Sequence, residues 1–332
     1  LHFFKGQRVN GLFSLRTDTA RRGRALIAAV PSQPLTGRGV ALMLGSVLCF
    51  ALMAITIRLA SEQLHPFQIA FFRNLFGLLF TLPLIWPTGL TLLRTSRLRL
   101  YLLRCLTGLC AMLTGFWALV HLPLAQAVAL SYTTPLFVTI LAVLVLGEVV
   151  RARRWSAIAI GFVGVLVIVR PGLDGLQFAA LVALASSALS ASSAISIKFL
   201  SRSEPPDAIV IWMVLIMTPM SLLPALPFWQ APEPTIWLWL VLTGGLGTAG
   251  HICLTRAFRL ADVSALQPLN FLQLPIVALV AWILFAEKVD IWTVVGAGVI
   301  FTSTIYIARR EARLHRARVT DPEIGSESMP NR

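Results

Sequence analysis

Two arginines lie inside long apolar runs of the chain, where a charged side chain is costly. Arg73 stands in the run 67–87, and Arg104 stands in the run 100–120. Arg73 is roughly 10 Å from the start of its run at 1.5 Å per residue, and two interpretations of it carry equal weight. Its guanidinium binds a carboxylate or phosphate of a small molecule, or it extends to the interface. For Arg104 we favour the interface, because its side chain leans that way.

Uncharged polar side chains in other apolar runs can also bind a small molecule. Tyr132, Asn270 and Gln273 lie near the middle of their runs. A phenol or an amide in hydrocarbon needs a hydrogen-bond partner, and we favour a ligand over bridging between helices. For His251 a structural role is the stronger interpretation. Trp117 can stack on a planar ligand, but packing in the core or against lipid is the more common role of such a residue.

Four charged residues at the ends of apolar runs form two expected pairs. Glu148 and Glu287 each close a run, and a carboxylate at a helix C-terminus is unfavourable for the helix dipole. Each therefore needs a basic partner. Counting the runs puts Lys198 on the same side as Glu148, and Arg58 on the same side as Glu287. One hypothesis is that the pairs are gates that are alternately made and broken, but we favour fixed interfacial salt bridges.

The patterns of enzyme and metal sites are absent from the sequence. It contains no catalytic triad, no glycine-rich phosphate loop and no metal-ligand spacing of Cys and His. The 14 Asp and Glu residues all lie at the ends of apolar runs, in loops or in the tails, so no carboxylate is placed at depth to carry protons. We expect no catalytic residues, no metal and no cofactor.

Helices in a bilayer must position these residues. Of the 332 residues 57% are hydrophobic and only 13% are charged, whereas soluble domains carry about 25% charged residues. About 20 apolar residues cross the hydrocarbon core, and ten runs approach that length. They span residues 39–60, 67–87, 100–120, 123–147, 155–170, 176–200, 208–229, 236–258, 263–286 and 291–309. We expect an all-α polytopic membrane protein with ten transmembrane helices.

Basic residues are distributed unevenly over the loops. The net charge is +14, and 23 of the 28 Lys and Arg residues fall on one side of the predicted membrane, against three on the other. By the positive-inside rule both tails are cytoplasmic: a basic N-terminal tail, 1–38, and a C-terminal tail, 310–332, which we expect to be disordered. A transit peptide is the alternative for the first tail, and residues 25–30 are too short for a signal peptide. Because the basic residues lie in the loops and tails of one side of the predicted membrane, we attribute the positive charge to topology and exclude nucleic acid as a partner.

The two halves of the chain resemble each other at a spacing near 140 residues. Residues 51–61 (ALMAITIRLAS) match residues 191–201 (ASSAISIKFLS), and the sequence around Glu148 matches that around Glu287. Each half contains five runs, an odd number, so the second half enters the membrane upside down relative to the first. Inverted repeats are typical of secondary transporters, which bind near the midplane and alternate between two conformations.

Small side chains form stripes along two of the predicted helices. One stripe comprises Gly108, Ala111, Gly115 and Ala118, and another comprises Ser186, Ser190 and Ser193. Small residues let helices approach closely in a membrane. We interpret both stripes as packing surfaces in preference to ligand contacts.

Longer stretches resemble a known family. The segments PLFVTILAVLVLGEVVRARRWSAIAIGFVGVLVIVRPG (135–172), PIVALVAWILFAEKVDIWTVVGAGVI (275–300) and FRNLFG (72–77) are similar to parts of EamA repeats of the drug/metabolite transporter superfamily. The resemblance covers residues 39–310. It implies a central cavity lined by helices 1–4 and 6–9, with helices 5 and 10 at the periphery.

The repeat and the resemblance together indicate an organisation and a function. We expect two inverted five-helix repeats, 39–170 and 176–309, that transport a small organic metabolite, amino-acid-like or related, by alternating access. S-adenosylmethionine, a drug or a vitamin is the alternative cargo, and a channel or a membrane-embedded enzyme is the alternative class. The expected partners are the small-molecule substrate and the lipid bilayer of a bacterial inner membrane, and a homodimer is left open.

Overall fold

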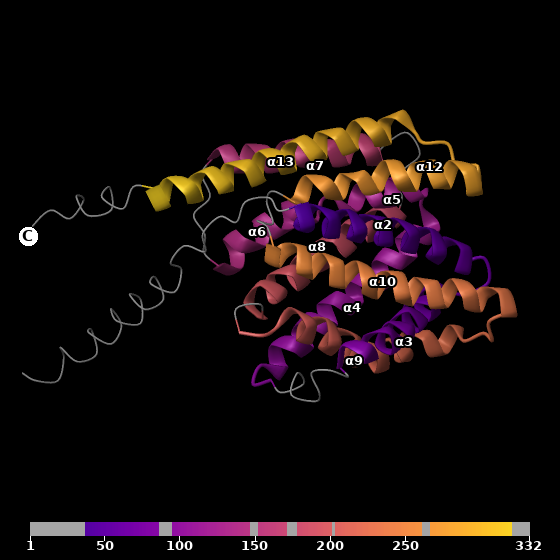
Figure 1. Ribbon diagram of the computed structural model, residues 1–332. Helices are drawn as coiled ribbons and strands as arrows, with labels where there is room; N and C mark the ends of the chain where they lie inside the picture. Colours follow the sequence, from indigo (N-terminus) through magenta and orange to yellow (C-terminus); the bar gives the residue numbers. More distant parts are fainter. Residues whose placement is uncertain are drawn as a thin grey trace, which may run out of the picture. The chain divides into compact units, whose positions relative to one another are not determined.

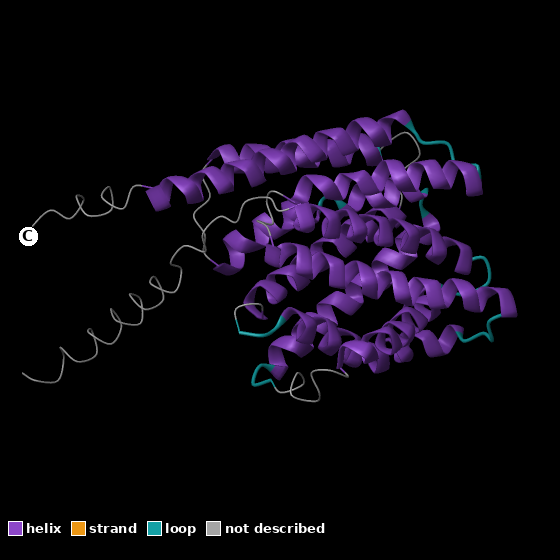
Figure 2. Ribbon diagram, viewed as in Figure 1, coloured by secondary structure: helices purple, strands orange, loops and turns teal. Residues whose placement is uncertain are grey.

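The computed structural model describes residues 37–85, 95–146, 152–170, 178–200, 203–260 and 266–320. Within these ranges every regular element is a helix (Figure 2). The first half contains α2 (Gly37–Ala60), α3 (Pro66–Ile85), α4 (Leu98–His121), α5 (Leu124–Ser131), α6 (Thr134–Leu146) and α7 (Ala152–Val169). The second half contains α8 (Phe178–Leu200), α9 (Pro206–Ala225), η2 (Leu226–Phe228), α10 (Pro234–Leu260), η3 (Gln267–Leu272), α12 (Gln273–Phe285) and α13 (Ile291–Thr320).

Many of these helices have the length and composition of membrane spans. Among the described residues, six segments are long and apolar enough to cross a bilayer. They are Gly37–Ala60, Leu98–His121, Leu124–Leu141, Phe178–Ile197, Asp207–Phe228 and Pro234–Ala257. Four shorter apolar segments are Pro66–Leu82, Trp155–Val169, Leu269–Phe285 and Ile291–Tyr306. Helices satisfy their backbone hydrogen bonds internally, which the hydrocarbon core requires.

Helices of the first half pack mainly against helices of the second half within the compact unit Pro34–Ala312. The pairs with the most extensive contact are α2 with α10, α4 with α8, and α3 with α9 (Figure 1). Small residues permit the approach of α4 and α8, since a Cβ on Gly115 would lie 2.8 Å from Oγ of Ser186. Leu1–Gln33 and Arg313–Arg332 form a separate unit, of which only the end of α13 is described.

The helices α7 and α13 lie against each other (Figure 1). A Cβ on Gly164 would lie 2.8 Å from the carbonyl oxygen of Gly296, so the two backbones are almost in contact. The hydroxyl of Ser303 donates a hydrogen bond to the carbonyl oxygen of Ala157 across the same interface. Close packing of this kind is typical of helix pairs in membranes.

Two predicted spans are broken in the structure. The run 123–147 contains α5 and α6, separated at Tyr132 and Thr133. Pro135 explains the break, because proline has no N–H and its ring clashes with the carbonyl group four residues earlier. In the second half the 3₁₀ helix η3 precedes α12, and prolines at 268 and 275 have the same effect there.

The C-terminal helix differs from the sequence prediction. The helix α13 continues to Thr320, so the expectation of disorder from residue 310 is wrong as far as Thr320. The added residues are mainly Arg, Ala, Glu and Leu, which favour a helix even without an apolar environment. The predicted N-terminal tail up to residue 36 and the last residues, 321–332, lie outside the described part of the chain.

Candidate substrate cavity

A cavity of about 450 Å³ lies between the two halves of the chain. This volume is within the range of small-molecule sites, about 300–1,000 Å³. The lining residues belong to α2, α3, α4 and α5 of the first half and to α8, α9, α10 and α12 of the second. None of the described lining residues lies on α7 or α13, which agrees with the central cavity that the family resemblance implies.

Two arginines line this cavity and are almost completely buried. Arg73 on α3 is 3% exposed, and Arg104 on α4 is 5% exposed. Nη1 of Arg73 donates to Oδ1 of Asn74 at 3.0 Å, and Asn74 in turn donates to Oγ of Ser221 at 3.1 Å. These neutral partners orient the guanidinium of Arg73 and leave its charge uncompensated.

Arg104 has weaker partners. Its Nη2 donates to the thioether sulfur of Met213 at 3.1 Å. Sulfur atoms are weak acceptors. The Nε and Nη1 atoms of Arg104 are buried and have no hydrogen-bond partner among the described residues. The guanidinium therefore has unused donors at the cavity wall.

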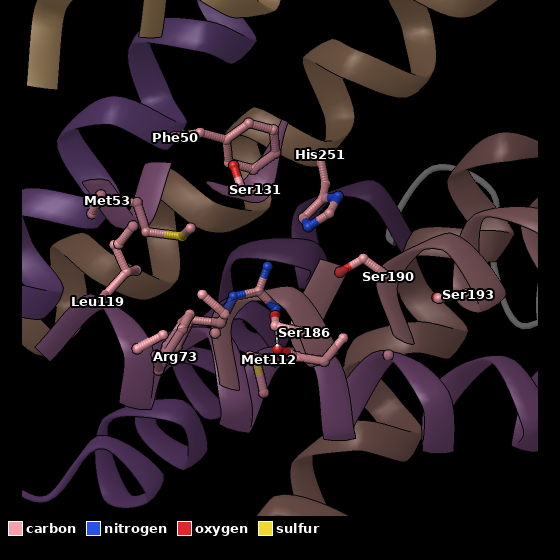
Figure 3. Close-up of a pocket in the computed structure, with 18 of the residues that line it drawn as sticks. Phe50, Met53, Arg73, Met112, Leu119, Ser131, Ser186, Ser190, Ser193 and His251 are labelled. Carbon is pink, nitrogen blue, oxygen red and sulfur yellow. Dashed lines mark hydrogen bonds between the residues drawn. The ribbon is translucent and has the colours of Figure 1, made fainter. Parts of the chain in front are cut away.

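Further polar side chains face the same space. Ser190 on α8, His251 on α10 and Gln273 on α12 line the cavity. The imidazole of His251 packs edge-on against the ring of Phe50, with 5.1 Å between the ring centroids. Figure 3 shows the guanidinium of Arg73, the imidazole of His251 and the hydroxyl of Ser190 directed toward a common region. The cavity thus presents several donors to a guest.

The remaining wall is apolar and adaptable. Its larger side chains are those of Phe50, Met53, Met112, Phe116, Leu119, Met213 and Met217. Methionine adjusts its shape easily and makes favourable contacts with aromatic rings. A mostly apolar wall with a few convergent polar groups is the usual composition of a small-molecule site.

The broken helices contribute to the cavity from both halves. Ser131, the last residue of α5, and Gln273, the first residue of α12, both line it. Discontinuous helices at corresponding places in two halves of a transporter usually mark the binding site, because helix ends offer backbone groups to a ligand. The two breaks therefore point to the same cavity as the arginines.

The six predicted ligand contacts fall into two groups. The structure brings Arg73, His251 and Gln273 together in the cavity lining. The other three, Tyr132, Asn270 and Trp117, lie outside the described lining. The hydroxyl of Tyr132 donates to the backbone carbonyl oxygen of Asn270 at 3.2 Å. Trp117 stacks on the ring of His121, with 3.8 Å between the ring centroids. A role for Tyr132, Asn270 or Trp117 in binding stays a prediction.

Several lining residues were interpreted differently from the sequence. Arg104, expected to extend to the interface, faces the cavity instead. The stripes of Gly108, Gly115, Ser186 and Ser190 pack α4 against α8 and also line the cavity. The sequence did contain a signal for this arrangement, because Arg104 and a stripe of small residues lie on the same predicted helix. Small residues leave room beside a large polar side chain.

A cluster of contacts ties several helices at one end of the bundle. Nη2 of Arg58 and Oε1 of Glu287 form an ion pair at 2.6 Å, as expected for two residues on the same side. Oε2 of Glu287 accepts from the backbone N–H of Leu124 at 2.8 Å. Nη1 of Arg58 donates to the carbonyl oxygens of Leu119 and Val120 at 2.7 and 2.6 Å. The ion pair thus joins α2 and the segment after α12 to the ends of α4 and α5.

The second predicted pair, Glu148 with Lys198, is only partly described by the structure. Glu148 falls in a segment that the structure does not describe, and of Lys198 only the backbone, in α8, is described. Their pairing stays a prediction.

Loop contacts reinforce the end of the bundle that holds Glu287. Nε2 of Gln68 donates to the carbonyl oxygen of Gln230 at 2.5 Å, and Oε1 of Gln68 accepts from the N–H of Gln230 at 3.2 Å. The ring of His65 stacks on Phe228 with 3.8 Å between centroids. Partial burial lowers the pKa of His65 below its ordinary value, and the nearby His121 lowers it further. The neutral imidazole is therefore the favoured form.

Known proteins resemble this chain over most of its length. A riboflavin transporter of Vibrio cholerae is 32% identical over 286 residues, which are 84% of this chain and 95% of the relative. An S-adenosylmethionine uptake transporter of Rickettsia prowazekii is 29% identical over 276 residues, 83% of this chain and 94% of the relative. A pseudopaline exporter of Pseudomonas aeruginosa is 28% identical over 278 residues, 82% of this chain and 96% of the relative.

A solved crystal structure and a family model complete the comparison. The crystal structure has a TM-score of 0.59 and 18% sequence identity, and the match covers 82% of this chain and 98% of that one, so the fold is shared. The model of the EamA-like transporter family matches residues 37–170 and again residues 177–309. The chain therefore belongs to the EamA-like transporter family and is a multi-pass membrane transporter of small molecules, not an enzyme.

Proposed function

We propose that the protein is a secondary transporter that moves a small organic metabolite across the membrane by alternating access. The observation that carries the proposal is the cavity of about 450 Å³, which is lined by helices from both halves and contains buried polar groups. Polar and charged groups inside a membrane are costly and usually mark a substrate pathway. A site between two halves can be exposed to either side when the halves rock against each other.

The architecture that suits this mechanism is a pair of inverted five-helix repeats, 39–170 and 176–309. If α5 with α6 counts as one broken span, and η3 with α12 as another, each half supplies five spans. The two matches of the family model support the repeat. With the basic loops inside, both termini are cytoplasmic, and the bacterial relatives favour the inner membrane.

In this mechanism the pair of Arg58 and Glu287 closes one side of the cavity. It joins α2, α4, α5 and the end of α12, and all four helices line the cavity. Opening this side requires the ion pair to break. We propose Glu148 and Lys198, which occupy the corresponding positions of the repeat, as the pair at the other end.

The relatives define the compounds to be tested first. Riboflavin and S-adenosylmethionine enter the panel because relatives about 30% identical carry those names. Amino acids and their derivatives enter because the cavity combines buried cations with apolar walls. The relatives include both an uptake transporter and an exporter, so the direction of transport must be measured.

Counterflow in liposomes tests the proposal. Vesicles that contain the purified protein are preloaded with one unlabelled compound from the panel, and a trace of the labelled compound is added outside. A carrier exchanges the two and accumulates label transiently above equilibrium. Equilibration without an overshoot would instead indicate a channel. No flux of any compound, from protein shown to be folded, would contradict the transport of these metabolite classes.

A further inference from the structure

The charge balance of the cavity is unusual for a site inside a membrane. Its described lining includes Arg73 and Arg104 but no Asp or Glu. Both residues are more than nine-tenths buried. The described carboxylates that form ion pairs, Glu287, Asp290 and Asp207, bind other basic residues. A buried charge without a countercharge is strongly unfavourable, so a further group is required to complete the site.

The donors of the two arginines are available to a guest in the cavity. Nε and Nη1 of Arg104 have no partner among the described residues. Arg73 donates through Nη1 to Asn74, and its Nε and Nη2 have no hydrogen-bond acceptor among the described residues; Gly247, which lacks a side chain, lies beside this edge of the fork. A guanidinium fork matches the oxygens of a carboxylate or phosphate, and such charge-assisted bonds are strong in a dry site.

Neighbouring side chains suit the same kind of guest. The hydroxyl of Ser190 and the imidazole of His251 point toward the region of the Arg73 guanidinium (Figure 3). The amide of Gln273 adds a further donor on the wall. The methionine and phenylalanine side chains can enclose the apolar remainder of an organic molecule.

We propose that Arg73 and Arg104 together bind an oxyanion of the transported compound, so that the substrate is a small organic molecule that carries a carboxylate or a phosphate. This inference rests on the proposed function, because it assigns the substrate class of the same cavity. The charge of the substrate replaces the missing protein carboxylate. The empty cavity then carries an energetic penalty that the loaded cavity does not, which favours exchange of one substrate for another over return of the empty carrier.

Matched pairs of compounds test the inference on the unmodified protein. Each pair differs in the oxyanion: riboflavin phosphate against riboflavin, S-adenosylmethionine against its decarboxylated form, and phenylalanine against phenethylamine. Binding to the full-length protein in detergent is measured as a shift in its melting temperature over a range of concentrations. In at least one pair, the member with the oxyanion is expected to bind about tenfold or more tightly, the size of a buried charge-assisted bond.

Substitutions then identify the residues responsible. Arg73→Gln and Arg104→Gln remove the charge and keep a polar side chain. Each is expected to abolish the preference for the oxyanion while leaving the affinity for the other member of the pair within about threefold. Arg97→Gln is the matched control, because Arg97 precedes α4, is exposed and lies outside the described lining. If a variant fails to fold, the inference is still tested by whether the unmodified protein binds the member of each pair that has the oxyanion more tightly.

The outcomes separate this inference from the proposed function. Equal or tighter binding of the member without the oxyanion in every pair would overturn the inference, and so would the absence of binding by every oxyanion at millimolar concentration. Counterflow of compounds that lack an oxyanion would then leave the transport proposal intact. An oxyanion that binds through the two arginines but shows no counterflow would support the site and contradict the transport of that compound.

Discussion

At the scale of single residues, Gly247 on α10 leaves the space that the Arg73 guanidinium occupies. A Cβ at position 247 would lie 2.8 Å from Nε and 3.1 Å from Nη2 of Arg73. Such contacts are too short, and the fork is also held by Asn74, so a methyl group would displace it. The position therefore tests whether the orientation of Arg73 matters, without changing any charge.

We predict that Gly247→Ala weakens substrate binding by about tenfold, because the displaced fork no longer makes a charge-assisted bond. The variant Gly298→Ala is the control, since a Cβ at position 298 meets no atom within 4 Å. Both changes raise helix propensity by about 1 kcal/mol, but only the Cβ at position 247 is crowded, so the melting temperature of each variant is measured to separate a loss of stability from a loss of binding. Equal affinities of the two variants in counterflow would contradict the prediction.

The residue types in the sequence predicted part of the cavity lining. The rest could not be predicted, because the sequence does not show in which direction each side chain points. Arg73, His251 and Gln273 were recognisable as polar groups in apolar runs. Arg104 was also recognisable as a charge in an apolar run but was assigned to the interface, because a run that is apolar on all sides does not show which face meets the protein. Tyr132 and Asn270 had the right chemistry, yet the hydroxyl of Tyr132 donates to the backbone carbonyl oxygen of Asn270.

At the scale of helices, the Arg58–Glu287 pair connects several helix ends. Arg58 supplies donors to the last carbonyls of α4, and Glu287 accepts from the first N–H of α5. Both contacts suit the helix dipole, which favours cations at C-termini and anions at N-termini. Ala286, with a φ of 52°, ends α12 in the left-handed conformation, and this turn brings Glu287 to its partners.

We predict that Glu287→Gln lowers the free energy of unfolding by about 2 kcal/mol, because it removes a charge-assisted bond from a mostly buried pair. The side chains of this pair are 21% and 18% exposed, whereas those of the Arg170–Asp290 pair are 39% and 37% exposed. The control Asp290→Asn should therefore cost less than about 1 kcal/mol. Thermal unfolding in detergent measures both, and equal losses would contradict the importance of the Glu287 pair.

The His65–Phe228 stack makes the same end of the bundle sensitive to pH. Because folding lowers the pKa of His65, the unfolded chain binds a proton first as the pH falls below about 6.5. The stack is at full strength above that pH and is weakened progressively below it. We predict that the melting temperature falls more between pH 7.5 and pH 5.5 in the unmodified protein than in His65→Phe. An equal fall in both would show that His65 does not contribute.

Helices were easier to predict than their interruptions. Long apolar runs have little choice of structure in a bilayer, so the positions of the helices could be read from composition. The breaks at Tyr132 and before Gln273 depend on how proline fits a given turn, and hydropathy does not record this. The extension of α13 to Thr320 depends on helix propensity, which a search for apolar runs ignores.

At the scale of the whole chain, the main features are the contacts between its halves. The pairs α2–α10, α4–α8 and α3–α9 each join one helix from either half. The repeat predicted that the halves would share an interface. The choice of partners could not be predicted, because helices that are apolar all round show no preferred face. The cavity follows from that choice, since its lining is divided between the halves.

Labelling of a cysteine in the cavity from each side of the membrane tests alternating access most directly. Ser190→Cys is suitable because Ser190 lines the cavity and serine and cysteine are similar in size. The four native cysteines are replaced first, and a membrane-impermeant thiol reagent is applied to vesicles of either orientation. A cross-link between Arg58→Cys and Glu287→Cys then locks one side.

We predict labelling from both sides without the cross-link, and from only the opposite side with it. Labelling from one side alone in the unlocked protein, or from both sides in the locked protein, would contradict alternating access.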